Sequence, residues 1–181
     1  MSGVTVHIPT LETARLTLRA LRLGDFEAYA ATFASPRSRF MGTLTRREAW
    51  NSFASEAVDW LFRGHGIWAI DLKGGPHIVL TGIGQPDHFP EPEIGWILHD
   101  GHEGHGYATE AAETARDWAR NRVTSLVSYI DLANHRSISV ARRLGATADP
   151  RAALPRGETA DETVVYRHWG KTATRRKVAI A

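Results

Sequence analysis

The sequence contains no cysteine among its 181 residues. This absence excludes a disulfide framework, a thiolate metal site and a cysteine nucleophile. An acyl-transfer reaction on this chain would therefore proceed without a cysteine-bound acyl intermediate.

Long apolar runs are missing as well. No stretch approaches the ~20 consecutive apolar residues that span a bilayer, and the first ten residues, MSGVTVHIPT, lack the basic start and apolar core of a secretory signal. Hydrophobic residues make up 43% and charged residues 23%, as in ordinary globular proteins. We therefore expect a cytoplasmic, globular protein without a membrane partner.

Charge of either sign is in small excess only, since 22 basic and 20 acidic residues give a net charge of +2. Part of the basic excess lies in residues 171–181, where Lys171, Arg175, Arg176 and Lys177 fall close together. No aromatic residue is interleaved with them, so a nucleic-acid surface is not predicted. We expect one domain over residues 1–170 and a basic, flexible tail over residues 171–181.

Apolar spacing predicts an alternation of strands and helices. Alternating leucines predict a strand over residues 13–21, and Asp25 is expected to cap a helix over residues 26–33. A second helix is expected to start after Thr45 and to end near Phe62. The remaining expected elements are strands at 67–72, 78–84, 93–98, 126–132 and 162–169 and helices at 107–120 and 134–144. This order predicts an α/β fold in which helices pack on a mixed sheet.

The most informative segment is EIGWILHDGHEGHGYATE, residues 93–110. It predicts a strand, a glycine-rich turn and the start of a helix. Gly104 and Gly106 can adopt backbone angles that are closed to other residues. A helix start offers unpaired N–H groups and the positive end of the helix dipole. The segment therefore predicts phosphate binding by backbone amides, and a purely structural turn is the alternative.

Five segments in order strengthen this prediction: TARLTLRALRLGDFEAY, GHGIWAI, EIGWIL, GHGYATEA and NHRSISVARRLGA. Through them the chain resembles the GNAT (GCN5-related N-acetyltransferase) superfamily over nearly its whole length. Within that superfamily it resembles the RimJ/RimL-type branch, which acetylates the N-termini of ribosomal proteins. The resemblance implies a twisted, mixed, mostly antiparallel sheet of six to seven strands flanked by about four helices. It also implies acetyl-CoA as co-substrate and an amine as acceptor.

The resemblance assigns cofactor contacts to two segments. It implies that the pyrophosphate lies over backbone amides of Gly104, His105, Gly106, Tyr107, Ala108 and Thr109. It implies that the pantetheine arm pairs with the backbone of Trp96, Ile97 and Leu98. The superfamily places Arg or Gln where this chain has Glu103. Because a carboxylate beside a diphosphate is unfavourable, Glu103 is expected to point away from it.

Asn134 and Ser137 match the superfamily's Asn-x-x-Ser, in which both side chains face the cofactor arm. Many members carry a tyrosine acid four residues after that serine, and here the position is Ala141. The leaving thiolate would therefore be protonated by Ser137 or by water. In the alternative interpretation Ser137 only caps the helix or packs against pantetheine.

Amine acylation sets the remaining requirements. An alkylamine is mostly protonated at neutral pH and must lose a proton before it can attack. Glu93 is our candidate for accepting that proton through water, and a surface carboxylate at a strand end is the alternative. A backbone N–H of the Trp96–Leu98 strand would stabilise the developing oxyanion. Direct transfer in a ternary complex is expected.

Two other classes of function compete with this hypothesis. His99, His102 and His105, with Asp100 and Glu103 between them, suggest a metal-binding hydrolase or metal-binding module. However, HEGH lacks the i, i+4 histidine pair of a helical zinc motif, and we expect no metal. The second competitor is a catalytically silent acyl-CoA sensor, which Ala141 and Glu103 favour.

The acceptor is the least defined part of the prediction. A protein α-amine and a small-molecule amine suit the same chemistry, and both a monomer and a homodimer are compatible with the sequence. We expect specificity to depend on residues 33–44, the second helix and the loop before the last strand. Among the tryptophans, Trp50, Trp60 and Trp118 are expected in the core, whereas Trp68 and Trp96 are candidates for the acceptor pocket.

Overall fold

The computed structural model of the chain describes residues 5–170. These residues form eight strands, four α-helices and two short 3-10 helices. They divide into two compact units, the first made of residues 5–84 and 94–122 and the second of residues 85–93 and 123–170. The expected basic tail, residues 171–181, lies outside the described residues, and a single domain over residues 1–170 stays a prediction.

The first unit is built on a sheet. Strands β1 (Leu11–Glu12), β2 (Leu16–Arg19), β3 (Ile67–Leu72) and β4 (His77–Gly84) are antiparallel neighbours in this order. Strand β5 (Glu93–Leu98) lies beside β4, where the Thr81 hydroxyl donates to the carbonyl oxygen of Gly95 at 2.7 Å. Strands β3 and β4, at the positions expected for the 67–72 and 78–84 strands, form an antiparallel pair.

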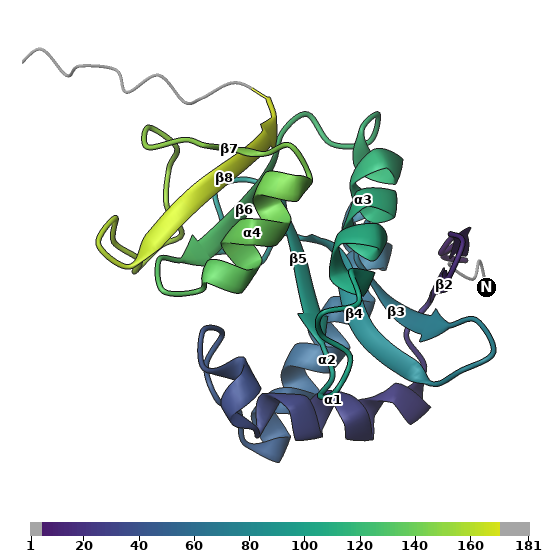
Figure 1. Cartoon of the computed structure of the whole chain (residues 1–181). Helices are drawn as coiled ribbons and strands as arrows, with labels where there is room; N and C mark the ends of the chain where they lie inside the picture. Colours follow the sequence, from purple (N-terminus) through teal and green to yellow (C-terminus); the bar gives the residue numbers. More distant parts are fainter. Residues whose placement is uncertain (1–4, 171–181) are drawn as a thin grey trace, which may run out of the picture. The chain divides into compact units, whose positions relative to one another are not determined.

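Helices cover both faces of this sheet (Figure 1). Helices α1 (Phe26–Phe33) and α2 (Arg46–Arg63) pack their aromatic side chains on Ala69 and Leu80. The next residue position along β3 points to the opposite face. There Trp68 contacts Trp118 of α3 (Tyr107–Ala119), with 5.0 Å between the ring centroids. Strand β3 is therefore buried on both faces, as its apolar sequence IWAIDL suggests.

Local end signals explain where α2 begins and ends. The Thr45 side chain accepts a hydrogen bond from the Glu48 amide, and the Glu48 carboxylate accepts one from the Thr45 amide. This reciprocal cap satisfies two donors that the first helical turn leaves unpaired. Gly64 follows the last turn with φ 70°, the left-handed conformation that ends many helices.

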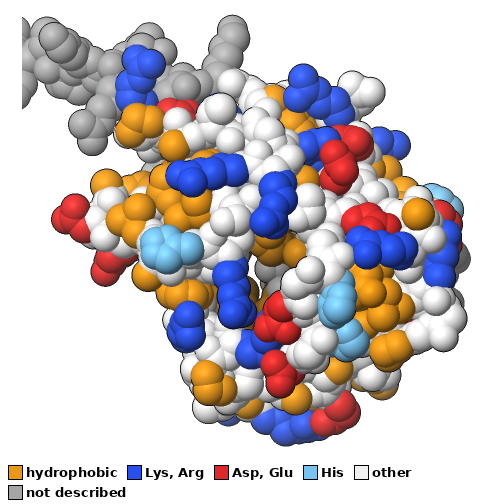
Figure 2. Space-filling model, in the orientation of Figure 1, with side chains coloured by type: hydrophobic (Ala, Val, Ile, Leu, Met, Phe, Trp, Pro, Cys, Tyr) orange, Lys and Arg blue, Asp and Glu red, His pale blue; other side chains and the backbone are white. Residues whose placement is uncertain are grey.

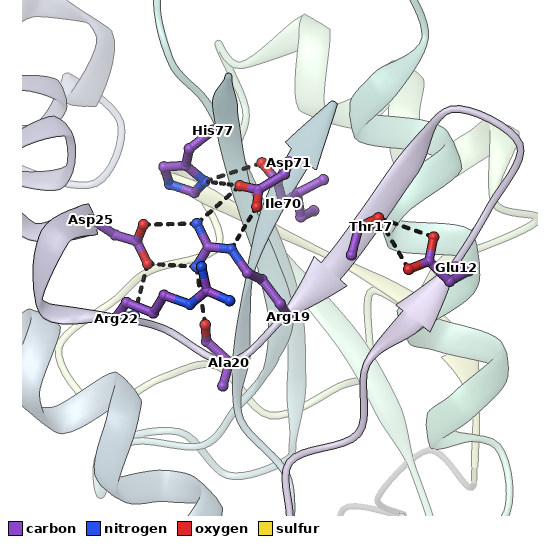
Figure 3. Close-up of polar contacts among 9 residues, drawn as sticks. All are labelled: Glu12, Thr17, Arg19, Ala20, Arg22, Asp25, Ile70, Asp71 and His77. Carbon is purple, nitrogen blue, oxygen red and sulfur yellow. Dashed lines mark hydrogen bonds and ion pairs between the residues drawn. The ribbon is translucent and has the colours of Figure 1, made fainter. Parts of the chain in front are cut away.

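Asp25 is the N-cap residue of α1, as expected, but its side chain makes no capping hydrogen bond to that helix. It is also the last residue of the 3-10 helix η1 (Leu23–Asp25), where its carboxylate accepts from the Arg22 amide at 2.7 Å. The carboxylate is also bound by the Arg19 guanidinium at 2.8 and 2.9 Å (Figure 3). The opposite side of Arg19 binds Asp71 at 2.6 and 2.9 Å, so one buried guanidinium joins two carboxylates. The strong ion pair outcompetes the cap.

The tryptophan predictions are partly wrong. Trp60 is in the core as expected, but 45% of Trp50 is exposed because it lies on the solvent side of α2 against Phe26. Trp68, a candidate for the acceptor pocket, is fully buried between Trp60 and Trp118, and its indole N–H donates to Pro9 O at 2.8 Å. Periodicity alone could not distinguish the rim of the helix from its buried face.

The second unit contains a smaller sheet and one helix. Strands β6 (Leu126–Asp131) and β8 (Thr163–Trp169) are antiparallel, and β7 (Thr147–Ala148) pairs with the other side of β8. Helix α4 (His135–Arg143) packs on β6. Glu93, the first residue of β5, belongs to this unit and pairs in parallel with Val127 of β6.

These elements confirm the predicted fold class, a mixed and mostly antiparallel sheet with four α-helices. The two strands beyond the expected number, β1 and β7, are only two residues long. On the face drawn in Figure 2, acidic and basic side chains are interspersed with hydrophobic ones. Within residues 5–170 no helix is both long and apolar enough to cross a membrane.

Candidate active site

The glycine loop, residues 99–106, joins β5 to α3 in the first unit. Gly104 and Gly106 have φ angles of 81° and 80°, in the left-handed region that side chains with a Cβ rarely adopt. No atom lies within 4 Å of where a Cβ on Gly104 would be. The loop thus requires glycine for its backbone angles and leaves open space above the main chain.

Helix α3 begins directly after this loop without a side-chain cap. Gly106 is its N-cap residue, and the first backbone bond of the helix runs from the Glu110 amide to Gly106 O at 3.1 Å. The amides of Tyr107, Ala108 and Thr109 precede that bond and therefore have no acceptor within the helix. Together with the helix dipole they can bind an anion such as a phosphate.

Arg15 fastens this helix start to the strand region before β2. Its Nη1 donates to His105 O at 3.0 Å, and its Nε donates to Glu110 Oε2 at 2.7 Å. The Thr13 hydroxyl donates to the other carboxylate oxygen of Glu110 at 2.5 Å. Burial alone would raise the pKa of Glu110, but these bonds hold it below its usual value. The pairing cancels a negative charge that would otherwise oppose an anion at the helix start.

Glu103 is paired with Arg37. The Arg37 Nη1 makes a short contact with Glu103 Oε1 and a second contact with Asp100 Oδ1 at 3.2 Å. The Arg37 Nε donates to Leu98 O at 3.0 Å. The guanidinium comes from the 3-10 helix η2 (Pro36–Ser38), 66 positions from Glu103 in the sequence. A guanidinium from outside the loop therefore pairs with the carboxylate that stands where the superfamily resemblance led us to expect Arg or Gln.

His99 is held neutral at the start of the loop. Burial first, and then the neighbouring His77, His102 and Arg37, lower the pKa of His99 to about 4. The Thr32 hydroxyl donates to Ala28 O, so it accepts from His99 Nδ1 at 2.6 Å and fixes the proton on that nitrogen. His99 thus connects the loop to α1 through its hydrogen bond with Thr32.

The three loop histidines do not form a metal centre. Of the described residues, no three or more His, Cys, Asp or Glu side chains gather in a group that could hold a metal ion. His99 bonds Thr32, whereas His105 is exposed and stacks on Tyr107 with 5.4 Å between the ring centroids. The chain segment is a turn, so its three-residue spacing does not align the imidazoles.

The residues expected to pair with pantetheine, Trp96, Ile97 and Leu98, are half-buried along β5. They directly precede the glycine loop in the first unit, so the strand and the helix start lie next to each other in the chain. The carbonyl of Leu98 already accepts from Arg37. An extended ligand would pair with the remaining backbone groups of this strand.

The predicted catalytic carboxylate, Glu93, lies in the second unit. Its Oε1 accepts a hydrogen bond from the Tyr129 amide of β6 at 3.0 Å. The Tyr129 ring packs edge-on against Phe89 at 5.0 Å, and burial followed by the charge of Glu91 raises the pKa of its hydroxyl above the usual range. Glu93 is thus partly buried and oriented by a backbone donor, unlike a free surface carboxylate at a strand end.

Asn134 and Ser137 also lie in the second unit, at the start of α4. Asn134 is the N-cap residue, and its Oδ1 accepts from the Ser137 amide at 3.2 Å. The cap is therefore made by Asn134, and the half-buried Ser137 hydroxyl does not make it. Ala141, at the position where many GNAT members carry a tyrosine, is fully buried.

Comparison with known proteins identifies the class of this chain. The family model "Acetyltransferase (GNAT) domain" matches residues 15–147. An acetyltransferase from Agrobacterium tumefaciens str. C58 is 44% identical, with 92% of this chain and 98% of that chain covered and a TM-score of 0.82. The chain therefore belongs to the GNAT acetyltransferase family and is an acetyltransferase.

More distant structures share the fold. The ribosomal L7/L12 alpha-N-protein acetyltransferase RimL, in complex with coenzyme A, is 15% identical with a TM-score of 0.69 and covers 88% of this chain and 97% of its own. The microcin C7 self-immunity acetyltransferase MccE, in complex with acetyl-CoA and AMP, is 16% identical with a TM-score of 0.67 and covers 86% and 92%. Both structures contain coenzyme A or its acetyl ester.

Sequence patterns did not predict that three side chains would contact the glycine loop or the start of α3: Arg15, Arg37 and Thr32. Each reaches the loop or the helix start from a segment at least 60 positions away. Arg37 and Thr32 carry no motif of their own. The sequence signal at this place was the mismatch at Glu103, from which we expected only that the carboxylate would point away from the diphosphate.

Proposed function

We propose that this acetyltransferase moves an acetyl group from acetyl-CoA to a primary amine by direct transfer in a ternary complex. The observation that carries the proposal is the uncapped start of α3 behind the two left-handed glycines, Gly104 and Gly106. Such a start suits a diphosphate because its free amides and dipole favour negative charge. The open space above Gly104 supports the same assignment.

The bound co-substrate supplies an acetyl thioester, and the chain's own groups position it. Amides from Gly104 to Thr109 would hold the diphosphate. The backbone of Trp96–Leu98 would align the pantetheine arm and offer an N–H to the reacting carbonyl oxygen. In this assignment no metal takes part.

Three residues of the second unit complete the proposal. Glu93 would accept the amine proton through a water, since its carboxylate is fixed by the Tyr129 amide and remains an acceptor. Asn134 shapes the start of α4 through its cap. Ser137, whose hydroxyl does not make that cap, would face the cofactor arm and donate to the leaving thiolate, with water as the alternative donor.

The resemblance in five sequence segments favours a protein α-amine as acceptor. The fold shared with RimL agrees with this choice, and a small-molecule amine is the second candidate because the acylation chemistry is the same. We expect residues 33–44, α2 and the loop before β8 to distinguish the two. An acceptor screen with N-terminal peptides and with polyamines tests this point.

The cofactor assignment is tested by calorimetric titration with CoA. The wild-type chain should bind one CoA, and a variant with Gly104→Val and Gly106→Val should lose binding because valine is strained at φ near 80°. Gly101→Ala serves as a control, since Gly101 has the same φ but precedes the helix start by five positions. Unchanged affinity in the double variant would refute the loop assignment.

A turnover assay separates an enzyme from a silent acyl-CoA sensor. With an amine acceptor present, the enzyme consumes acetyl-CoA and releases free thiol, which a thiol reagent detects. A sensor would bind CoA with the same loop and release no thiol.

A further inference from the structure

The chain has a carboxylate, Glu103, where the GNAT resemblance predicts a side chain able to donate to the diphosphate. Asp100 adds a second carboxylate to the same loop. Two negative charges within four residues of the expected diphosphate site would weaken anion binding unless they are neutralised. The structure shows one nearby guanidinium that contacts both of them, that of Arg37.

We infer that Arg37 is a positioning residue for the cofactor loop, which it makes competent for the diphosphate by neutralising Glu103 and holding Leu98. This inference rests on the proposed function of the loop. Three contacts support it, to Glu103, to Asp100 and to the carbonyl of Leu98. They span the loop from the end of β5 to the residue before Gly104.

Arg37 is itself held in place before any ligand arrives. The Ser35 side chain accepts from the Arg37 amide at 3.2 Å and caps η2. Ser38, fully buried, donates to Phe33 O at 2.9 Å. With its backbone fixed on both sides, the guanidinium loses little freedom when it binds the loop, which makes the contact effective.

The partial burial of Arg37 and Glu103 strengthens their ion pair. Only 22% of the Arg37 side chain and 30% of the Glu103 side chain are exposed, whereas 92% of Asp100 is exposed. Charges screened from water interact more strongly than exposed ones. Glu103 is therefore the carboxylate that Arg37 chiefly neutralises, whereas the charge of Asp100 is largely screened by solvent.

The inference makes a prediction about pairs of substitutions. Arg37→Met should weaken CoA binding by about tenfold, because the carboxylate of Glu103 loses the positive charge of Arg37 beside the diphosphate. Arg37→Met combined with Glu103→Gln should bind CoA within about threefold of wild type, because the offending charge is gone. Glu103→Gln alone should bind CoA at least as tightly as wild type.

The experiment is calorimetric titration of each full-length variant with CoA, beside a thermal melt that checks folding. Arg39→Met is the matched control, since Arg39 is exposed two positions further on and stacks on Phe40 instead of contacting the loop. It should leave CoA affinity unchanged. A merely structural role for Arg37 would lower the melting temperature without recovery of affinity when Glu103 is neutralised.

A second pair of variants, Glu103→Arg with and without Arg37→Met, tests the role of Arg37 if Arg37→Met alone does not fold. Glu103→Arg installs the residue that the family pattern expects, and Arg37→Met in that background should change CoA affinity by less than about threefold. A loss of tenfold or more there, or no recovery in Arg37→Met with Glu103→Gln, would overturn the role of Arg37. Failure of the wild-type chain to bind CoA would instead overturn the proposed function, and this inference with it.

Discussion

Glu56 offers a sharp test of how this fold treats a buried charge. It lies in the middle of α2, half-buried, one turn before Asp59 and facing Tyr29 of α1. Burial, and next the negative charge of Asp59, raises the pKa of Glu56 from 4.5 to about 7. The same burial, together with the charge on Glu56, raises the pKa of Tyr29, whose hydroxyl bonds Ser52 at 2.8 Å.

The raised pKa means that ionised Glu56 destabilises the folded chain. In the unfolded chain the carboxyl loses its proton near pH 4.5, whereas in the folded chain it keeps the proton until about pH 7. Between these values the folded state binds more protons, so the free energy of unfolding falls as pH rises. A pKa difference of this size corresponds to a few kcal/mol, and partial exposure reduces this to about 2 kcal/mol.

Glu56→Gln removes the charge and keeps the shape. Urea unfolding should show the variant about 2 kcal/mol more stable than wild type at pH 8, with the difference vanishing near pH 4.5. Glu113→Gln on α3 is the control, because 56% of the Glu113 side chain is exposed, and it should change little at either pH. A Glu56→Gln variant that is less stable than wild type at pH 8 would refute the reasoning.

Two further predictions concern the second unit. Arg167 binds Glu91 through two bonds of 2.8 Å and Asp149 at 2.5 Å. Arg167→Met should therefore cost about 3–5 kcal/mol at pH 7, because two carboxylates lose the guanidinium that balances their charge. Hydrogen bonds from Arg167 lower the pKa of Glu91, so this stabilisation is present above pH 4.5 and is lost as pH falls through the folded-state pKa. Urea unfolding should therefore show a smaller cost of Arg167→Met at pH 3 than at pH 7. An equal cost at both pH values would contradict the prediction. Glu93→Gln keeps an oxygen that can accept from the Tyr129 amide, so steady-state turnover should fall about 10²-fold while calorimetric CoA affinity stays unchanged. A fully active variant would exclude Glu93 as the base.

Much of the fold was predictable because its signals are local. Residues 26–33, 67–72 and 93–98 form the expected elements with the expected bounds. Helix α2 begins after Thr45 because the threonine and Glu48 form a cap within four residues. Such patterns depend on neighbouring side chains and backbone angles, which the sequence displays directly.

The failures share the opposite property, since each depends on tertiary contacts that the local sequence pattern does not display. Asp25 has the residue type of a helix cap, but Arg19 in the preceding strand claims its carboxylate. Trp50 has core spacing on α2, but the groups that would cover it are absent from its side of the helix. Trp68 was a candidate for the acceptor pocket, but Trp60 and Trp118 pack against it and bury it in the core.

Glu103 shows what a mismatch to a family pattern means physically. On its own, the carboxylate argues against diphosphate binding and in favour of a silent sensor. Beside Arg37 it becomes half of an ion pair, whose guanidinium comes from η2. In our proposal, the carboxylate that departs from the pattern is neutralised by a residue 66 positions away in the chain. Sequence comparison at position 103 alone therefore cannot decide between an active loop and a degenerate one, whereas CoA binding by the Arg37 and Glu103 variants can.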